Sequence, residues 1–570
     1  MIFYRRRCAA GETDTVAISI VLAQINPTVG AIEKNARAAA DIIRKARDMN
    51  FDLVVFPEMV VTGYPTNDLL FEHGFVAENE RVVDELILPH TRDIAVILGC
   101  VRSEPGRRIT PDEPCLRNCA AVLAGGKWIA QVNKALLPNY DVFDEKRYFI
   151  PAAESAIAPV DIPIRDRTLK TGVQICEDLW DEHYSTKVTK LLCERGAELI
   201  VNISASPFYV GKNREREELV RAAVVEHKRP FVYCNMVGGQ DELVFDGRSF
   251  VMGADARVMA RAAAFEQEIC VVELDTDTWS GPEAPEPAYS REQDILNAHI
   301  LNLRDYFFKQ GIFKGITVGL SGGVDSAYTA FVAAQAIGPE NVLCVAMPSQ
   351  FTSQQSLDDA EQCARNIGAQ YKVVSIKEMF EQGVASFARA FGETPFGLAE
   401  ENDQSRFRMI VLMKISQKFG YMVCTTGNKS EISTGYFTMF GDGSGGKNVP
   451  GDLYKTELYQ VVRHINRERE IIPQSIIDKP PTAELRENQK DTDSLPPYPE
   501  LDPVIKLVVE GHLSKAQIVE RGYSRELVDK VYGLYKKSEF KRGQLPLGIK
   551  ISKKAYGAGR RIPITNQWQG

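Results

Sequence analysis

Residues 318–326, which read VGLSGGVDS, limit the possible folds of this chain more than any other stretch. An apolar run at 316–320 enters two glycines, and an alanine-rich apolar run follows, which predicts a strand, a tight turn and a helix. Gly322 and Gly323 let the backbone approach an anion, and helical N–H groups can donate to it. The pattern predicts a phosphate-binding loop, in which Asp325 requires a cation such as Mg²⁺.

This loop is not of the Walker type, because no Gly-Lys-Ser/Thr follows it. The string SGGVDS resembles the pyrophosphate loop of the N-type ATP pyrophosphatases, which attach AMP to a substrate oxygen. A glycine-serine turn without a ligand is the alternative. The resemblance implies that ATP contacts Gly319, Leu320, Ser321, Gly322, Gly323, Val324, Asp325 and Ser326.

Length and composition exclude several classes of protein. A chain of 570 residues is too long for one core, so two or more domains are expected. The net charge of -8 argues against a general nucleic-acid binder. Eleven cysteines without a CxxC pair indicate a reducing cytoplasm. No apolar run approaches 18 residues, so no membrane span is expected.

The first half reads as a layered α/β sandwich. Residues 31–49 have helical periodicity. Apolar runs predict strands at 16–24, 52–58, 94–101, 118–123, 171–175 and 199–203. We predict a loose extension at 1–15, a domain at 16–276, a linker rich in proline and acid at 277–290, and a second domain at 291–570.

Three residues of the first half stand at strand ends or in loops and form a possible catalytic set. Glu58 could take the proton of Cys176, and Lys134 could stabilise the oxyanion that forms when the thiol attacks an amide. Taken singly, each has a plainer interpretation: a strand-end glutamate, a surface lysine and a buried cysteine.

Together these three residues resemble the Glu-Lys-Cys triad of the nitrilase (carbon–nitrogen hydrolase) family. The words FPE, K-x-x-L-P, F-x-E and I-C-E-D carry the resemblance over about residues 16–275. It implies an α-β-β-α sandwich, a supporting role for Glu145 and hydrolysis of a primary amide through a thioester. Ser206 and Lys212 would hold the amino-acid end of glutamine, and Tyr140 would line the pocket.

The second half alternates strands and helices beyond the phosphate loop. Strands are predicted at 341–347 and 370–376, with a helix at 357–367 between them. This order predicts a doubly wound parallel sheet, which binds ligands at the carboxyl ends of its strands. Arg406 and Arg408 open a long helix, and at most one of them is expected to point into the pocket.

The words TGNKSE and TGYFT, together with SGGVDS, resemble the NAD synthetase family. The resemblance implies that Thr426 and Lys455 contact ATP and that Asp325 and Glu431 hold Mg²⁺. Met439 stands where ammonia-using synthetases have a lysine, and segments 441–451 and 478–499 are candidate lids. The residues implied for deamido-NAD are Asn402, Glu431, Tyr436, Phe437, Thr438, Met439 and Lys541.

In this order, the two halves resemble glutamine-dependent NAD synthetases. The resemblance implies that ammonia from glutamine reaches an adenylated deamido-NAD along a sheltered path, giving NAD, AMP and pyrophosphate. It also implies a homodimer of the synthetase domain within a larger symmetric assembly, such as an octamer. One alternative is another ATP-dependent glutamine amidotransferase, such as one making GMP or asparagine. The other is a scaffold with an inactive nitrilase domain, which would require a broken triad.

Overall fold

The structure is a computed structural model, and it describes residues 3–6, 17–286, 288 and 290–568. Within the stretch predicted as a loose extension, Phe3–Arg6 forms strand β1 and pairs in parallel with β15 (Glu268–Asp275). This part of the extension is therefore a strand, because its backbone groups continue the ladder of a sheet. Residues 1–2 and 7–15 of the predicted extension lie outside the described residues.

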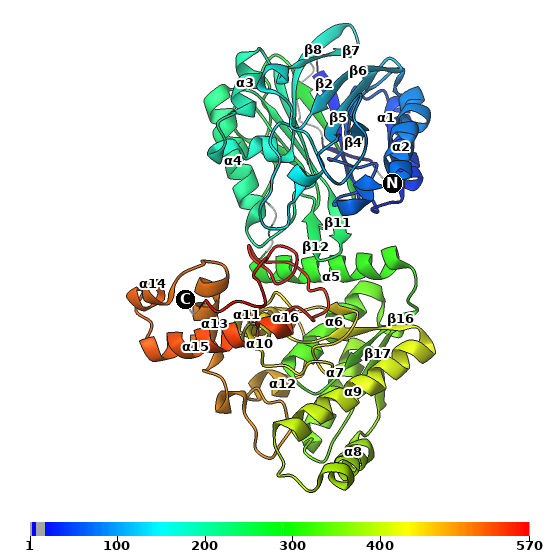
Figure 1. Cartoon of the computed structure of the whole chain (residues 1–570). Helices are drawn as coiled ribbons and strands as arrows, with labels where there is room; N and C mark the ends of the chain where they lie inside the picture. Colours follow the sequence, from blue (N-terminus) through cyan, green and yellow to red (C-terminus); the bar gives the residue numbers. More distant parts are fainter. Residues whose placement is uncertain (1–2, 7–16, 287, 289, 569–570) are drawn as a thin grey trace. The chain divides into compact units, whose positions relative to one another are not determined.

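The chain folds as two compact units (Figure 1). The first comprises Met1–Gln240 and Val244–Ala288, and the second comprises Asp241–Leu243 and Tyr289–Gly570. The boundary after residue 288 falls inside the predicted linker. Part of that linker packs on the first unit, since the buried Ala284 donates its amide to the carbonyl of Val258 at 2.7 Å.

The first unit contains a seven-stranded mixed sheet with the order β1-β15-β2-β3-β4-β5-β6. Strands β2, β3 and β4 run parallel, and β5 and β6 continue the sheet antiparallel. Besides β1 and β15, its strands are β2 (Ala17–Gln24), β3 (Leu53–Val55), β4 (Ala95–Ser103), β5 (Leu116–Ala124) and β6 (Lys127–Asn133).

A six-stranded sheet with the order β14-β13-β10-β9-β8-β7 packs against the first. A separate two-stranded ribbon consists of β11 (Val237–Gln240) and β12 (Leu243–Asp246). The strands of the six-stranded sheet are β7 (Val160–Ile164), β8 (Arg167–Ile175), β9 (Leu199–Ser204), β10 (Phe231–Asn235), β13 (Phe250–Met252) and β14 (Val258–Arg261).

Alternation along β2 shows how these residues build a layered core. Ile20 and Leu22 join the core between the two sheets, whereas Val21 and Ala23 face the helices outside. Both sheets are covered in this way, which gives the predicted α-β-β-α sandwich. The covering helices are α1 (Ile32–Asp48) and α2 (His73–Val82) on the first sheet, and α3 (Val188–Glu194) and α4 (Lys212–His227) on the second.

The second unit contains a five-stranded sheet with the order β18-β17-β16-β19-β20. All of its pairs are parallel, so the prediction of a doubly wound parallel sheet is confirmed. The order reverses at β16, and ligands bind at such a switch point. The strands are β16 (Gly315–Gly319), β17 (Val342–Ala346), β18 (Gln370–Val373), β19 (Tyr421–Thr425) and β20 (Lys447–Asn448).

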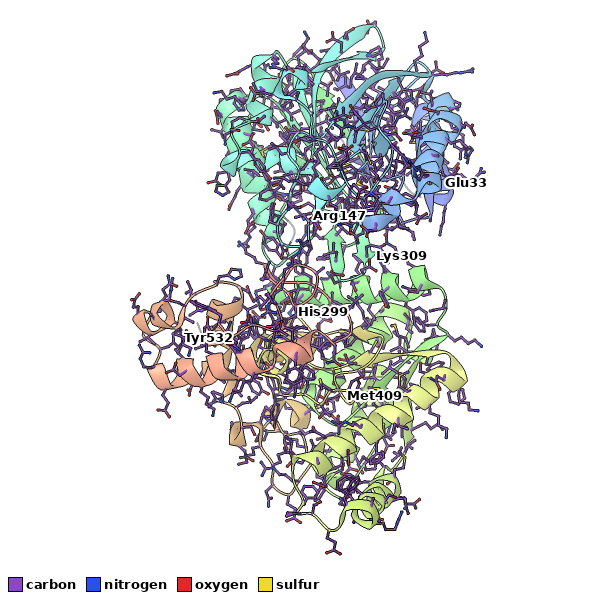
Figure 2. The ribbon with its side chains drawn as sticks, in the orientation of Figure 1. Glu33, Arg147, His299, Lys309, Met409 and Tyr532 are labelled. Carbon is purple, nitrogen blue, oxygen red and sulfur yellow. The ribbon has the colours of Figure 1, made fainter. Side chains whose placement is uncertain are left out.

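Helices surround this sheet and extend beyond it. In Figure 2, Met409 belongs to the core beside the sheet, and His299 lies on the long first helix, where its Nδ1 is 2.5 Å from the Tyr328 hydroxyl. Along the described chain no helix is both long and apolar enough to span a bilayer. The helices are α5 (Arg291–Gln310), α6 (Val324–Ile337), α7 (Gln354–Ile367), α8 (Lys377–Phe391), α9 (Leu398–Phe419), α10 (Lys429–Thr434), α11 (Lys455–Ile465), α12 (Gln474–Asp478), α13 (Tyr498–Val509), α14 (Lys515–Glu520), α15 (Arg525–Lys537) and α16 (Glu539–Arg542).

Two candidate active sites

The structure brings the three predicted catalytic residues of the first unit together at the ends of strands. Glu58 follows β3, Lys134 follows β6, and Cys176 follows β8. The Lys134 ammonium donates to Glu58 Oε1 at 2.8 Å and to Glu145 Oε1 at 2.9 Å. All four side chains are buried. The result is a lysine held between two carboxylates beside a thiol.

Further hydrogen bonds orient the carboxylate of Glu58. Asn118 donates its side-chain amide to Oε1 at 2.7 Å, and the backbone amide of Ala205 donates to Oε2 at 2.9 Å. Asn118 lies on β5 and Ala205 follows β9, so both sheets contribute to the site. A carboxylate fixed in this way can act as a base in one defined direction.

Cys176 stands at the first position of a short 3-10 helix, Cys176–Leu179, with a φ of 45°. Such a φ is costly for a residue other than glycine and is often found at functional sites. Burial and the charge of Glu58 raise the pKa of this thiol well above its ordinary value, although Lys134 opposes them. Cys176 is thus a thiol at neutral pH and needs a base at the moment of attack.

Burial and neighbouring charges shift the pKa values of the ionisable groups in this cluster. Burial opposes the charge on Lys134, but the Glu145 and Glu58 carboxylates outweigh it and raise the lysine pKa well above its ordinary value. Burial raises the pKa of Glu145 to about 7. The Tyr64 hydroxyl donates to Glu145 at 3.0 Å. Lys134 therefore stays an ammonium ion, which suits the stabilisation of an oxyanion.

The predicted glutamine-binding residues surround the same cysteine. The Lys212 ammonium lies 3.4 Å from the centre of the Trp180 ring, and burial lowers its pKa to about 8. The Tyr140 hydroxyl donates to Glu177 at 3.0 Å. Ser206 is buried, and its carbonyl accepts a hydrogen bond from Arg216 at 2.8 Å.

Sequence reasoning did not assign three of these neighbours: Glu177, Trp180 and Arg216. Two of them lie in or beside the I-C-E-D word, so that word was a usable signal for Glu177 and Trp180. Arg216 gave no local signal, because its role depends on a buried ion pair with Asp246, at 2.6 Å, thirty residues further along the chain.

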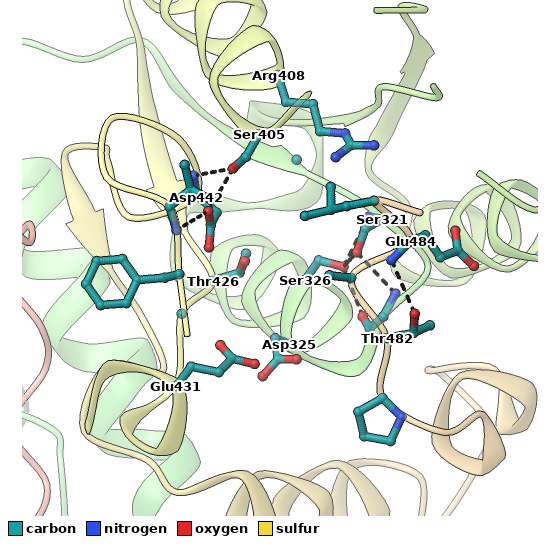
Figure 3. Close-up of a pocket in the computed structure, with 18 of the residues that line it drawn as sticks. Ser321, Asp325, Ser326, Ser405, Arg408, Thr426, Glu431, Asp442, Thr482 and Glu484 are labelled. Atoms are coloured by element: carbon teal, nitrogen blue, oxygen red, sulfur yellow. Dashed lines mark hydrogen bonds between the residues drawn. The ribbon is translucent and has the colours of Figure 1, made fainter. Parts of the chain in front are cut away.

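The second candidate site is a cavity of about 400 Å³ beside the parallel sheet of the second unit (Figure 3). All ten residues predicted to contact ATP line it. Of the residues predicted to contact deamido-NAD, all except Met439 line it as well. The carbonyl of Met439 instead accepts a hydrogen bond from Arg406 at 3.4 Å. Arg408 is the arginine that lines the cavity, as the helix spacing predicted for one of the two.

The phosphate loop is preorganised by its own serines. The Ser326 hydroxyl donates to the carbonyl of Gly323 at 2.9 Å and accepts the amide of Ser321 at 3.2 Å. Gly322 has a φ of 76°, and a Cβ there would lie 2.3 Å from the carbonyl oxygen of Ser356. Glycine is required at this position, and the loop leads directly into the N-terminus of α6.

Two acidic residues at the centre of the cavity share one lysine. Lys455 forms ion pairs with Asp325 and, at 3.4 Å, with Glu431. Figure 3 shows the two carboxylates side by side. Burial and the charge of Asp325 raise the pKa of Glu431 to about 8. Asn428 donates to Asp325 at 2.8 Å and fixes its orientation.

These carboxylates fit a Mg²⁺ ion that is also bound by phosphate. Mg²⁺ is usually held by one or two carboxylates together with water and substrate phosphates. Asp325 and Glu431 supply two such ligands, and burial together with the charge of Asp325 raises the pKa of Glu431, an effect that a bound cation would oppose. In the described part of the chain, no group of three or more potential protein ligands gathers to form a metal site made by protein alone.

The residues predicted for deamido-NAD form a connected wall of the cavity. Lys541 donates to the carbonyls of Gly435 and Phe437, both at 2.8 Å. The Thr438 hydroxyl donates to the side-chain oxygen of Asn402 at 2.7 Å. The wall therefore joins α9, the TGYFT segment and the C-terminal helix α16.

Both candidate lids contribute residues to the cavity. Asp442, from segment 441–451, accepts a hydrogen bond from Ser405 at 2.7 Å. Glu484, from segment 478–499, accepts hydrogen bonds from Ser356 at 2.8 Å and from Lys479 at 2.7 Å. Composition drew attention to these segments, but it did not single out which of their residues face the cavity.

Comparison with known proteins assigns a class to each unit. A model of the carbon-nitrogen hydrolase family matches residues 19–281, and a model of the NAD synthase family matches residues 295–545. The fold and the two sites thus define a carbon-nitrogen hydrolase unit joined to an NAD synthase unit, and the predicted fold class is confirmed.

Relatives along the whole chain give the family. Glutamine-dependent NAD(+) synthetase from Thermotoga maritima is 39% identical over 97% of this chain and 99% of its own length. The enzyme of the same name from Rhodobacter capsulatus is 40% identical over 96% of this chain and 98% of its own. The chain therefore belongs to the family of glutamine-dependent NAD(+) synthetases, as the sequence motifs predicted.

Solved structures agree with this assignment. Glutamine-dependent NAD+ synthetase from Acinetobacter baumannii, in complex with ADP, is 34% identical with a TM-score of 0.76, covering 96% of this chain and 99% of that one. A glutamine-dependent NAD(+) synthetase from Cytophaga hutchinsonii has a TM-score of 0.80 at 21% identity, covering 97% and 98% of the two chains, which supports the fold alone.

Proposed function

We propose that this protein releases ammonia from glutamine at Cys176 and uses it to convert deamido-NAD into NAD with ATP. The observation that carries the proposal is the buried lysine–carboxylate cluster beside Cys176 in a chain that also contains a phosphate-binding cavity. The names of the relatives support the choice of glutamine and NAD.

At the first site, Glu58 takes the thiol proton as the Cys176 sulfur attacks the amide carbon of glutamine. The charge that develops on the amide oxygen is stabilised by the Lys134 ammonium. The proton returns from Glu58 to the leaving nitrogen, so that ammonia and a thioester form. Glu58 then activates a water molecule, which releases glutamate and restores the thiol.

Specificity for glutamine is assigned to the groups around Cys176. Lys212 pairs with the α-carboxylate of the substrate, while Ser206 and Tyr140 line the same end of the pocket. The cation–π contact of Lys212 with Trp180 holds the ammonium in place before the substrate arrives.

At the second site, the loop 321–326 and Lys455 bind the phosphates of ATP, and Thr426 contributes a further contact. Asp325 and Glu431 would hold Mg²⁺, which when bound neutralises phosphate charge. The wall that includes Asn402 and Lys541 places the carboxylate of deamido-NAD for adenylation. Ammonia then attacks the adenylated carboxylate and displaces AMP. Adenylation is needed because a free carboxylate resists attack by an amine.

We also propose a homodimer of the second unit within a larger symmetric assembly, which light scattering of the purified protein tests.

The test supplies deamido-NAD and ATP-Mg²⁺ with either glutamine or ammonium, and follows NAD, AMP and pyrophosphate. Wild-type protein is expected to use both nitrogen sources. Cys176→Ala is expected to lose glutamine-supported synthesis by at least about 10³-fold and to keep ammonium-supported synthesis, because only the first site needs the thiol. Equal loss with both nitrogen sources would refute this division of labour.

A further inference from the structure

Asp178 is a buried carboxylate that the steps above do not use. It is 2% exposed, and both of its oxygens accept hydrogen bonds from backbone amides. Oδ1 accepts from Ala135 at 3.0 Å and from Leu136 at 2.8 Å, and Oδ2 accepts from Ile175 at 2.9 Å. A carboxylate with three amide donors is a strong and directional link between chain segments.

The amides that Asp178 binds adjoin two catalytic residues. Ala135 directly follows Lys134, and Ile175 directly precedes Cys176. Lys134 comes after β6 of the seven-stranded sheet, whereas Cys176 comes after β8 of the six-stranded sheet. One side chain therefore joins the backbone that presents the ammonium to the backbone that presents the thiol.

We propose that Asp178 is a positioning residue of the glutaminase site, which sets the separation between the Lys134 ammonium and the Cys176 sulfur. The inference rests on the proposed function of that site. In this proposal, Asp178 does not contact the substrate. Catalysis depends on it because an oxyanion is stabilised only when the donor lies within hydrogen-bond distance of it, and an error of about 1 Å can cost about 10²-fold in rate.

The link requires the ionised form of the side chain. Burial raises the pKa of Asp178 to about 7, while the three backbone amides favour the anion. An asparagine at this position has a single acceptor oxygen. It can serve the amides of Ala135 and Leu136 or the amide of Ile175, but not both, because its NH₂ group then faces an N–H donor.

Asp178→Asn tests the proposal in the full-length protein. The kcat for glutamine hydrolysis is expected to fall on the order of 10²-fold, with KM for glutamine within about twofold, since the substrate-binding groups are untouched. Ammonium-supported NAD synthesis is expected to stay at the wild-type rate, which also reports that the second unit is folded. A substrate-binding role would raise KM instead.

Asp52→Asn is the matched control. Asp52 is also buried in the first unit, accepts the amide and hydroxyl of Ser19, both at 2.7 Å, and pairs with Arg165 at 2.6 Å. It precedes β3, whereas Glu58 follows the other end of that strand. The control is expected to lower the melting temperature of the first unit and to leave the kcat for glutamine hydrolysis unchanged.

Asp178→Glu provides a second variant if the asparagine variant does not fold. It keeps the charge but places the carboxylate one methylene further out, so kcat is expected to fall about tenfold or more. Wild-type kcat in either folded variant would overturn the proposal, as would a kcat loss of equal size in Asp52→Asn. If wild-type protein hydrolyses no glutamine, the proposed function of the first site is what fails, and this result is separate from any comparison of variants.

Discussion

The two candidate sites place the same charges, one lysine paired with two carboxylates, in different surroundings. In the first unit, the Lys134 side chain is 1% exposed, and its ion pairs with Glu58 and Glu145 are enclosed by protein. In the second unit, Asp325 and Glu431 pair with Lys455, and both carboxylates are 17% exposed to a cavity of about 400 Å³. One ion cluster is enclosed, and the other lines a cavity that has room for a ligand.

The substrates account for this difference. The reacting end of glutamine is a neutral amide, which brings no charge, so the protein alone must supply the ammonium that stabilises the transition state. ATP and the proposed Mg²⁺ bring large charges of both signs, and the second site needs room and partners for them. A small neutral group is thus met by a fixed ion cluster, and a large charged ligand by a cavity.

The largest effect that separates the sites is expected from Asp325→Asn. The change keeps the shape of the side chain but removes one of the two carboxylates proposed for Mg²⁺, so NAD synthesis should fall by about 10³-fold or more with either nitrogen source. Glutamine hydrolysis by the same sample is the control and should persist. Undiminished synthesis would remove Asp325 from the mechanism.

Lys134→Met should produce a loss confined to glutamine. Removing the ammonium takes away oxyanion stabilisation, expected to cost about 10²–10³-fold in kcat, while ammonium-supported synthesis continues. The variant should also lose about 3–5 kcal/mol of stability, since Glu58 and Glu145 stay buried after losing the ammonium that pairs with both. Adding Glu145→Gln should recover part of the melting temperature but none of the glutaminase activity, and recovered activity would contradict the role given to Lys134.

The pH dependence of glutamine binding gives a smaller effect. With a pKa lowered to about 8, Lys212 is charged below that pH and neutral above it. KM for glutamine should therefore rise about tenfold from pH 7 to pH 9, because the neutral amine no longer attracts the substrate carboxylate. Lys212→Arg should remove this difference, since guanidinium stays charged. Parallel profiles for the two proteins would assign carboxylate binding to another group.

The smallest effect is expected at the edge of the second cavity. Glu484→Gln removes the charge that binds Lys479, Ser356 of α7 and, at 3.0 Å, Ser353, which caps the N-terminus of α7. Segment 478–499 should then close less firmly, and KM for ATP should rise about fivefold or less, the size of a partly exposed ion pair. Glutamine hydrolysis should not change, and an unaltered KM for ATP would mean that this contact does not hold the segment.

Local patterns predicted the features that depend on neighbouring residues. The loop 321–326 could be read from its sequence, because a strand, a glycine turn and a helix follow one another there. The helix predicted at 31–49 is found as α1, Ile32–Asp48. The later strands of the first unit, from β10 to β15, were not predicted, because several are only three to five residues long and are fixed by pairing with distant strands. For the same reason Phe3–Arg6 read as a loose extension.

The sequence by itself determined the family and the three catalytic candidates, since their words stand in a recognisable order along the chain. The tertiary structure decided how those residues act on one another. It placed Lys134 between two carboxylates, excluded Met439 from the cavity wall and brought Asp178 to the amides beside both Lys134 and Cys176. Motifs show which chemical groups are present. Burial and distances of a few ångströms determine the charge and the partners of each group, and tertiary packing determines that burial and those distances.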